Sequence, residues 1–288
     1  MSRLIESVFC GDSVLIISKY LDPKDIVTIC RVFKKIRYNL YGIYVGSVMR
    51  VIDNWFRSYY GVNYDQFREA MIADKAIVTG SFILQMILGE RWKDSDIDMF
   101  ISIEDLYSIW NRSNCTEVEK FILNAPTTSK EEKIKKLSDT SLQYIDSFGP
   151  TGNIAQIRNY SVDGTKDSNF CKFQMIEVLK TQDIIKFIKE TFDFDVCKNT
   201  FYYDEDGMHL DILNINDILN RRIVFRIYDN LRSSIERCKK YAARGFKFTD
   251  ALDPPTNTYY SEIRTTFNKM LPALECGPGP KYCKSITV

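Results

Sequence analysis

The spacing of apolar residues predicts helices over the first quarter of the chain. Residues 13–45 have apolar positions at helical spacing, interrupted by a short polar turn. Asp22 in that turn suits an N-cap and Pro23 suits the first helical position, so a helix is expected to begin there. Residues 46–73 continue the helical spacing, with a break at Tyr59–Gly61. This part of the chain is therefore expected to form a helical module.

The middle of the chain changes to alternating strands and helices. A short strand is expected at Lys75–Thr79, a helix at Ser81–Leu88 and a strand at Asp96–Ile103. Residues 104–148 are polar and are predicted to be helical, and their charge run, Lys130–Lys136, is expected to be a solvated helix or loop.

Two runs rich in β-branched and aromatic residues predict a hairpin. They are Ile154–Val162 and Phe170–Leu179, and the turn-forming segment Asp163–Asp167 separates them. A short helix is expected at Thr181–Glu190 and a further strand at Phe192–Asn199.

Helices are predicted again in the last third of the chain. After an acidic turn at Asp204–Gly207, the sequence is expected to be mostly helical as far as Phe246. The whole pattern predicts an α+β protein with a mixed sheet. A helical module (1–65) precedes the central domain (66–250), and an irregular tail rich in Pro and Gly (251–288) follows.

The composition argues against several classes of function but does not identify the function. The chain has 288 residues with 39 basic and 38 acidic side chains, so any cationic patch must be local. No apolar run is long enough to predict a membrane span, and the start lacks a secretory signal pattern. The eight cysteines form no C-x-x-C pair, which favours reduced thiols in an intracellular, cytoplasmic protein. His209 is the only histidine, which argues against Ser-His-Asp chemistry.

Two acids stand one residue apart in a segment that otherwise reads as a strand. Side chains alternate along a strand, so Asp96 and Asp98 are expected to share a face. Two neighbouring carboxylates repel each other unless they share a proton or a cation lies between them. A distant Lys or Arg is one such cation, and Mg²⁺ or Mn²⁺, bound through carboxylate oxygens and substrate phosphates, is the simpler one.

A Gly-Ser pair stands where the preceding strand turns into a helix. Gly80 allows the backbone to approach a ligand, and the helix start at Ser81 presents free N–H groups to a phosphate. The Ser81 hydroxyl offers one more donor. A phosphate cradle beside a pair of metal-binding acids describes a nucleoside triphosphate site.

A third acid is expected if two metal ions act together on the transferred phosphate. The stretch Phe192–Lys198 (FDFDVCK) supplies Asp193 and, as second choice, Asp195. The simpler interpretation of this stretch is the polar face of an antiparallel sheet.

This order of elements resembles the nucleotidyltransferase superfamily with the DNA polymerase β-like palm, whose motif is G-S, a spacer, D-x-D and a later carboxylate. The resemblance covers about residues 70–210. It is nearest to the nucleotidyltransferase-like proteins of large DNA viruses, which carry an F-D-hydrophobic-x-x-C-K stretch and a later K-Y-x-x-R-G-F. This chain has Phe192–Lys198 and Lys240–Phe246 at the corresponding places.

The resemblance implies an enzyme. Asp96 and Asp98 would hold the metal of the nucleoside triphosphate, and with Asp193 or Asp195 they would hold a second one. A nucleoside monophosphate would then pass to a hydroxyl acceptor, with release of pyrophosphate. The acceptor is open between an RNA end, a protein and a small molecule, and a viral member would act in the host cell.

A basic helix near the end of the central domain is the expected contact for phosphates or a polynucleotide. It spans about Tyr228–Ala243, and Lys240 and Arg244 are assigned to the nucleotide through the K-Y-x-x-R-G-F match. The alternative is a solvated amphipathic helix that packs on the domain. The basic residues are Arg232, Arg237, Lys239, Lys240 and Arg244.

Residues 14–36 resemble an F-box, in which a Y-L turn leads into a D-P-x-D helix start. The usual Leu-Pro-x-Glu opening is replaced by Cys10–Ser13. The resemblance implies docking on the adaptor subunit of a ubiquitin ligase through the apolar residues Leu15, Tyr20, Leu21 and Val32. The alternative function is thus an F-box-type adaptor whose palm binds without catalysis, and a third is a nucleotide sensor without turnover.

Overall fold

A computed structural model describes residues 20–32, 37–92, 95–103, 116–124, 134–139, 154–162, 172–179, 183–225, 231–250 and 284–285. Several predictions concern residues outside these ranges. They are the opening of the F-box-like segment, the turn at 163–167, most of the polar segment 104–148, and the tail up to residue 283.

The predicted helical start is confirmed within the described residues. The helices are α3 (Pro23–Val32), α4 (Arg37–Tyr60), the 3-10 turn η2 (Gly61–Asn63) and α5 (Tyr64–Ala73). Asp22 caps α3 because its Oδ1 accepts the backbone N–H of Asp25 at 2.8 Å. Asp25 Oδ2 in turn accepts the N–H of Asp22 at 3.4 Å. The predicted break between helices is confirmed at Gly61, which has a φ of +54°.

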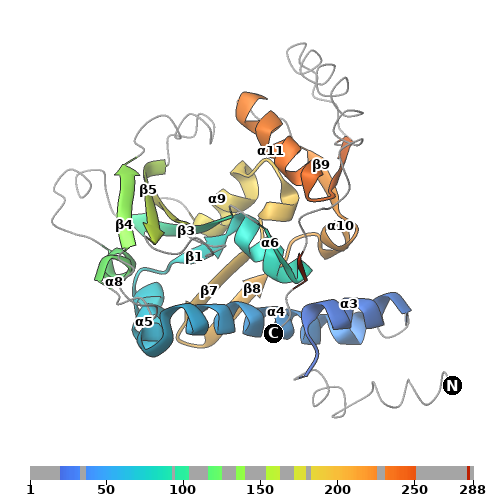
Figure 1. Cartoon of the computed structure of the whole chain (residues 1–288), viewed down its shortest axis with the longest axis horizontal. Coiled ribbons are helices and arrows are strands. Elements are labelled where there is room, and N and C mark those ends of the chain that lie inside the picture. Colours follow the sequence, from blue (N-terminus) through green and yellow to red (C-terminus); the bar gives the residue numbers. More distant parts are fainter. Residues whose placement is uncertain are drawn as a thin grey trace.

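A seven-stranded mixed sheet forms the centre of the protein, in the order β4-β5-β6-β3-β1-β7-β8 (Figure 1). Its strands are β1 (Ile77–Thr79), β3 (Asp96–Ile103), β4 (Ile134–Asp139), β5 (Ile154–Val162), β6 (Lys172–Leu179), β7 (Thr200–Asp204) and β8 (Gly207–Asp211). Only the β3–β6 pair is parallel among these neighbours. The predicted α+β class with a mixed sheet is therefore confirmed.

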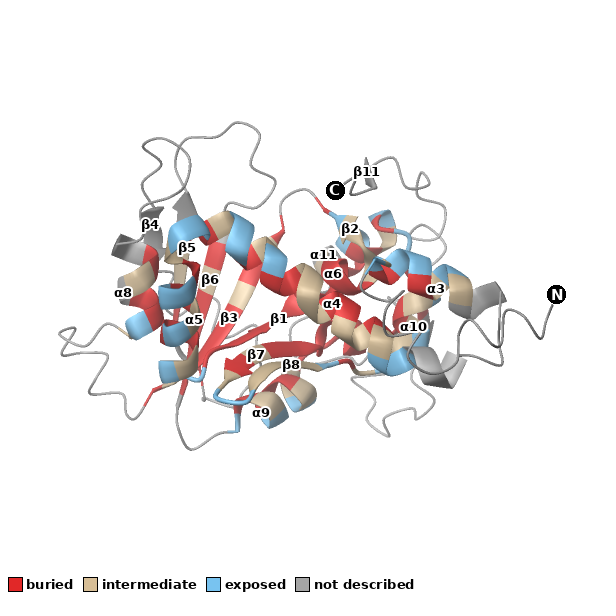
Figure 2. Ribbon diagram, turned by 90° about the horizontal axis from the view of Figure 1, so that it is seen from below, coloured by how far each residue is buried: buried red, intermediate tan, exposed pale blue. Residues whose placement is uncertain are grey.

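Helices cover both faces of this sheet. Figures 1 and 2 show α4 and α5 along one face and α9 (Ile184–Thr191) and α11 (Leu231–Ala243) on the opposite side. On the first face, Tyr59 of α4 packs against Phe173 of β6, with ring centroids 5.7 Å apart. On the other face, Phe187 of α9 packs against Phe100 of β3 at 6.3 Å. One hydrophobic core cluster includes residues from α3 to β10 (Lys247–Asp250).

The segment expected to be a strand at Phe192–Asn199 is not one. It contains a bend followed by the 3-10 helix η4 (Asp195–Cys197), and the strand β7 begins only at Thr200. Local bonds explain the difference: Asp195 pairs with Lys198 three residues on, and Asn199 Nδ2 donates to the Val196 carbonyl at 2.7 Å. These bonds close a turn, although Phe and Asp alternate as they do in a strand.

Two other regions contain more strand than predicted. Beyond Asp206 the chain forms β8, α10 (Ile215–Leu219), β9 (Arg222–Phe225), α11 and β10, with β9 and β10 parallel. Within the polar segment 104–148, α8 (Glu117–Asn124) is helical as expected, but β4 adds an antiparallel strand beside β5. Pairing with a distant strand, rather than local spacing, determines these strands. A further short pair joins β2 (Glu90–Arg91) to β11 (Lys284–Ser285).

None of the helices that the structure describes is both long enough and apolar enough to cross a lipid bilayer.

A buried carboxylate joins α4 to the rest of the protein. Asp53 is 8% exposed and accepts hydrogen bonds from Arg57 Nε at 2.8 Å and Tyr203 Oη at 3.0 Å. The Tyr64 hydroxyl also donates to it. Asp53 thus connects α4 with both α5 and β7, so these hydrogen bonds hold the covering helices on the sheet.

Asp53→Ala should lower the free energy of unfolding by about 2–4 kcal/mol, because two tyrosine hydroxyls lose a buried acceptor. Urea unfolding followed by circular dichroism measures the change. Gln66→Ala, at an exposed position of α5, is the control and should stay within about 0.5 kcal/mol of the wild type. Equal effects of the two substitutions would contradict the structural role of Asp53.

Candidate nucleotide and metal site

A tight turn joins β1 to α6 (Gly80–Leu88) and brings the backbone against an acid of β3. Gly80 has a φ of +76°, which disfavours a side chain. A Cβ atom at Gly80 would collide with Asp98 Oδ2 and lie 3.2 Å from Asp98 Cγ. Thr79 is the register partner of Asp98, so the turn and the acid are adjacent by strand pairing as well. The sequence places these two motifs apart, and the sheet brings them into contact.

The two acids of β3 form the predicted pair. Asp96 and Asp98 are both half-buried, and the intervening Ile97 is buried toward the opposite face. Desolvation and the charge of Asp96 raise the pKa of Asp98 from 3.8 to about 7, while Arg237 and Lys240 act in the opposite direction. The pair therefore carries negative charge that the surrounding residues compensate only in part.

Ser81 has a different environment from the one expected. Its Oγ lies 2.8 Å from Ser95 Oγ, and Gln85 Nε2 donates to Ser95 Oγ at 2.6 Å. The side-chain oxygen of Gln85, Oε1, accepts the Trp92 backbone N–H at 2.6 Å. This network fixes the residue before Asp96 against α6. The Ser81 hydroxyl is thus part of the support of the acid strand.

Asp193, the first choice for a third carboxylate, is paired with an arginine. It is 6% exposed, and its Oδ1 lies 3.0 Å from Arg237 Nη2 of α11. Desolvation acts to lower the pKa of Arg237, but Asp193 and, more weakly, Asp98 raise it, so that the net direction is upward. The guanidinium also stands over the Phe194 ring, 5.4 Å from its centroid.

Asp195, the second choice, is also paired. Lys198 Nζ lies 2.7 Å from Asp195 Oδ1, and the lysine is only 2% exposed. This buried pair closes η4. The structure therefore places Asp193 and Asp195 next to cations of their own.

Basic side chains of α11 and the turn after it interact electrostatically with the acids of β3. Asp96 and Asp98 act to raise the pKa of Lys240, but desolvation and Arg244 lower it overall. Arg244 is 8% exposed, and its guanidinium stacks on Trp92 at 4.0 Å and stands 5.1 Å from the centre of the Tyr241 ring. Within the described residues its buried Nη1 has no hydrogen-bond partner. A fixed, buried guanidinium with a free donor is typical of a site for an anion.

The residues fit a metal ion that brings its own phosphate ligands. Among the residues that the structure describes, no three His, Cys, Asp or Glu side chains are grouped closely enough to hold a metal ion. Mg²⁺ commonly binds through only one or two carboxylates and takes its other ligands from substrate phosphates and water. Asp96 and Asp98 supply such a pair.

The family of the chain follows from its sequence. Residues 50–221, more than half of the chain, match the family model described as Gabija anti-defense 2 family protein. The chain belongs to the Gabija anti-defense 2 family. The matched segment includes Gly80, Asp96, Asp98 and Asp193, whereas the basic residues of α11 lie beyond it. No curated protein matches the chain.

Among solved structures, the chain is similar to CCA-adding enzymes. The Thermotoga maritima enzyme complexed with tRNA is 13% identical, with a TM-score of 0.43, over 78% of this chain and 45% of that one. A CCA-adding enzyme with ATP is 14% identical, with a TM-score of 0.39, over 76% and 43% of the two chains. The complex with CTP is 13% identical, with a TM-score of 0.37, over 72% and 42%. The chain thus spans less than half of these enzymes.

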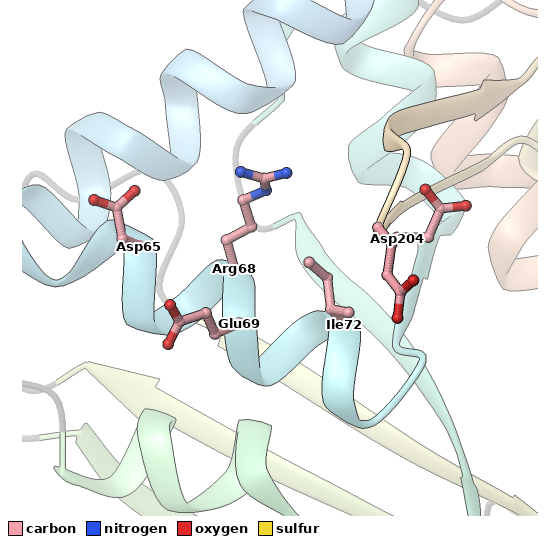
Figure 3. Close-up of a pocket in the computed structure, with 6 residues that line it drawn as sticks. Asp65, Arg68, Glu69, Ile72 and Asp204 are labelled. Atoms are coloured by element: carbon pink, nitrogen blue, oxygen red, sulfur yellow. The ribbon is translucent and has the colours of Figure 1, made fainter.

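A polar pocket lies elsewhere on the protein, between α5 and the β7–β8 turn (Figure 3). Its volume is about 370 Å³, and its lining residues are Asp65, Arg68, Glu69, Ile72, Asp204 and Glu205. Asp204 at its edge also contacts His209, whose Nε2 lies 2.7 Å from Asp204 Oδ1. None of the predicted site residues lines this pocket.

Sequence reasoning missed several residues that shape the site. No motif includes Gln85 of α6, Trp92 or Ser95. Only the hydrogen bonds of Gln85 to Trp92 and Ser95 identify these three residues. Arg237 was one of several basic residues on a predicted helix. Its spacing of three residues from Lys240 and seven from Arg244 on a helical period was the available signal.

Gly80→Ala should destabilise the protein by about 1–3 kcal/mol, because the backbone is left-handed there and the new methyl group displaces Asp98. The control is Gly42→Ala in α4, where an added Cβ meets nothing within 4 Å. That change should stabilise the helix by about 0.5–1 kcal/mol. Chemical unfolding measures both, and a neutral Gly80→Ala would contradict the close approach.

The raised pKa of Asp98 predicts a pH dependence of stability in metal-free protein. Between pH 3.8 and about 7 the unfolded chain has lost this proton while the folded chain retains it. Stability should therefore fall as the pH rises through that window. Asp98→Asn should gain stability relative to the wild type on going from about pH 4.5 to about pH 8.

Urea unfolding at both pH values measures this difference. Asp206→Asn, in the exposed β7–β8 turn, controls for the loss of a surface carboxylate. The same difference between Asp98→Asn and the wild type at both pH values would contradict the raised pKa.

Proposed function

We propose that this protein is a metal-dependent nucleotidyltransferase that moves a nucleoside monophosphate from a nucleoside triphosphate to a hydroxyl acceptor. The observation that carries the proposal is the opposition of two kinds of charge across one turn. Asp98 adjoins Gly80, and Lys240 and Arg244 interact electrostatically with the acids of β3. A nucleoside triphosphate with its metal ion complements both: the metal ion suits the acids, and the phosphates suit the basic side chains.

Asp96 and Asp98 would hold the divalent ion, Mg²⁺ or Mn²⁺. Their shared face and incomplete charge compensation favour a cation at this place. When bound, such an ion neutralises charge on the triphosphate and on the departing pyrophosphate. The contact with Gly80 fixes the Asp98 carboxylate beside the helix that receives the phosphates.

The phosphates would lie between α6 and the basic residues. The first turn of α6 has no side-chain cap at Thr79, so its N–H groups remain donors for an anion. Arg244 stacks on Trp92 and offers its Nη1, which has no hydrogen-bond partner in the part of the chain that the structure describes. Lys240 adds a second positive charge on the same side.

In the transfer, the acceptor oxygen bonds to the α-phosphorus as the bond to the bridging oxygen of pyrophosphate breaks. The hydroxyl proton passes to solvent, and pyrophosphate carries away the electron pair. Lys240 and Arg244 would stabilise the negative charge that moves onto the leaving group. The rigid stacking of Arg244 means that little reorganisation is needed at that moment.

The family name supplies the biological setting of the proposal. We propose that nucleotide transfer serves an anti-defense role against the Gabija system and that the acceptor is an RNA end, a protein or a small molecule of the infected cell. The adaptor alternative depends on apolar residues at the start of the chain. Of these, Tyr20 is 84% exposed and Leu21 is half-buried, whereas the side chains of Leu15 and Val32 lie outside the described set.

Calorimetry with each of the four nucleoside triphosphates tests the proposal. Wild-type protein should bind at least one of them only when Mg²⁺ is present. The double substitution Asp96→Asn/Asp98→Asn should weaken that binding at least tenfold, because the metal loses its carboxylate ligands. Asp206→Asn should leave it unchanged.

The titration, together with a measurement of pyrophosphate release, separates the competing functions. Absence of metal-dependent binding to folded wild type would refute the nucleotidyltransferase and favour the adaptor. Binding without release of pyrophosphate, after incubation with extracts of the host cell, would favour the nucleotide sensor.

A further inference from the structure

Arg237 forms an ion pair with a carboxylate of one element and interacts electrostatically with a carboxylate of another. It lies 3.0 Å from Asp193, in the segment before η4, and it also acts on the charge of Asp98 on β3. We propose that Arg237 takes the place of a second divalent cation, so that the protein works with one metal ion, bound by Asp96 and Asp98. This inference rests on the proposed function and specifies its metal requirement.

The position of Arg237 is fixed on two sides. Its Nη2 pairs with the buried Asp193 carboxylate, and its guanidinium lies over the Phe194 ring at 5.4 Å. Phe194 is itself buried between Tyr241 and Phe248, with ring centroids 5.3 Å and 5.9 Å away. A guanidinium held in this way is a permanent part of the site.

A second metal ion would need a carboxylate that is free to bind it. Asp193 Oδ1 lies 3.0 Å from Arg237 Nη2 in an ion pair, with no hydrogen bond to that oxygen among the described residues, and Asp195 pairs with Lys198 at 2.7 Å. A divalent ion beside Asp193 would also meet the positive guanidinium a few ångströms away and be repelled by it. Each candidate for a third carboxylate thus already has a cation of the chain beside it.

Arginine suits the role of a fixed cation. Its guanidinium remains protonated at all physiological pH values, so its charge does not depend on proton or metal concentration. It carries one positive charge where a divalent ion carries two, and it cannot activate a water molecule. The inferred role is therefore electrostatic: Arg237 compensates Asp193 and partly compensates Asp98 when the metal nucleotide binds.

Counting metal ions tests the inference directly. In equilibrium dialysis with Mn²⁺ and each of the four nucleoside triphosphates, bound Mn²⁺ and bound nucleotide are measured per chain. Wild type should bind one Mn²⁺ for each nucleotide. Arg237→Met should bind two, because Asp193 is released, and Arg237→Met/Asp193→Asn should return to one. Lys239→Met, two positions along the same helix, is the matched control and should bind one.

The possible outcomes separate the two proposals. Two Mn²⁺ ions per nucleotide in wild type would overturn the role of Arg237 and leave the nucleotidyltransferase standing. A single ion in folded Arg237→Met would overturn it as well. No metal-dependent nucleotide binding in wild type would overturn both. The wild-type count decides the matter even where Arg237→Met does not fold, and Asp193→Asn should then still bind one.

Discussion

The close approach of Gly80 to the Asp98 carboxylate is the contact on which the rest of the site depends. It requires a left-handed residue without a side chain at the end of β1, and it requires β1 and β3 to pair in one register. The contact puts the start of α6 and the acid pair side by side. The N–H groups that we propose for phosphate and the carboxylates that we propose for the metal ion then lie next to each other, and Arg237 and Lys240 of α11 interact electrostatically with these acids.

Charge balance is the second constraint. The acids of the site come from β3, from the segment before η4 and from η4. The cations near them differ in whether they are paired with a carboxylate. Arg237 and Lys198 form ion pairs with Asp193 and Asp195, whereas Arg244 keeps a buried donor without a partner among the described residues. The paired cations complete the fold. The Arg244 donor and the partly compensated Asp98 are the groups that we propose for a ligand with both phosphate and metal.

Rigidity on the opposite face supports this arrangement. The hydrogen bonds of Asp53 to α5 and β7 hold α4 against the sheet, and Tyr59 of α4 packs edge to face against Phe173 of β6. The acid strand β3 therefore lies between a fixed back face and a front face that α9 and α11 cover in part. Such support allows two neighbouring carboxylates to keep one geometry despite their repulsion.

The sequence by itself determined the α+β class, the strand–turn–helix at Gly80 and the shared face of Asp96 and Asp98, because each follows from local spacing of 2 or 3.6 residues. The prediction from sequence was wrong where the local spacing of residues is misleading. Phe and Asp alternate before Lys198 as in a strand, yet the Asp195–Lys198 pair folds the segment into a turn. Only the tertiary structure decided which cation meets which acid, because ion pairs form between elements that are far apart in the chain. The role that we propose for Arg237 therefore follows from its ion pair with Asp193, 44 residues earlier, and from no motif of its own.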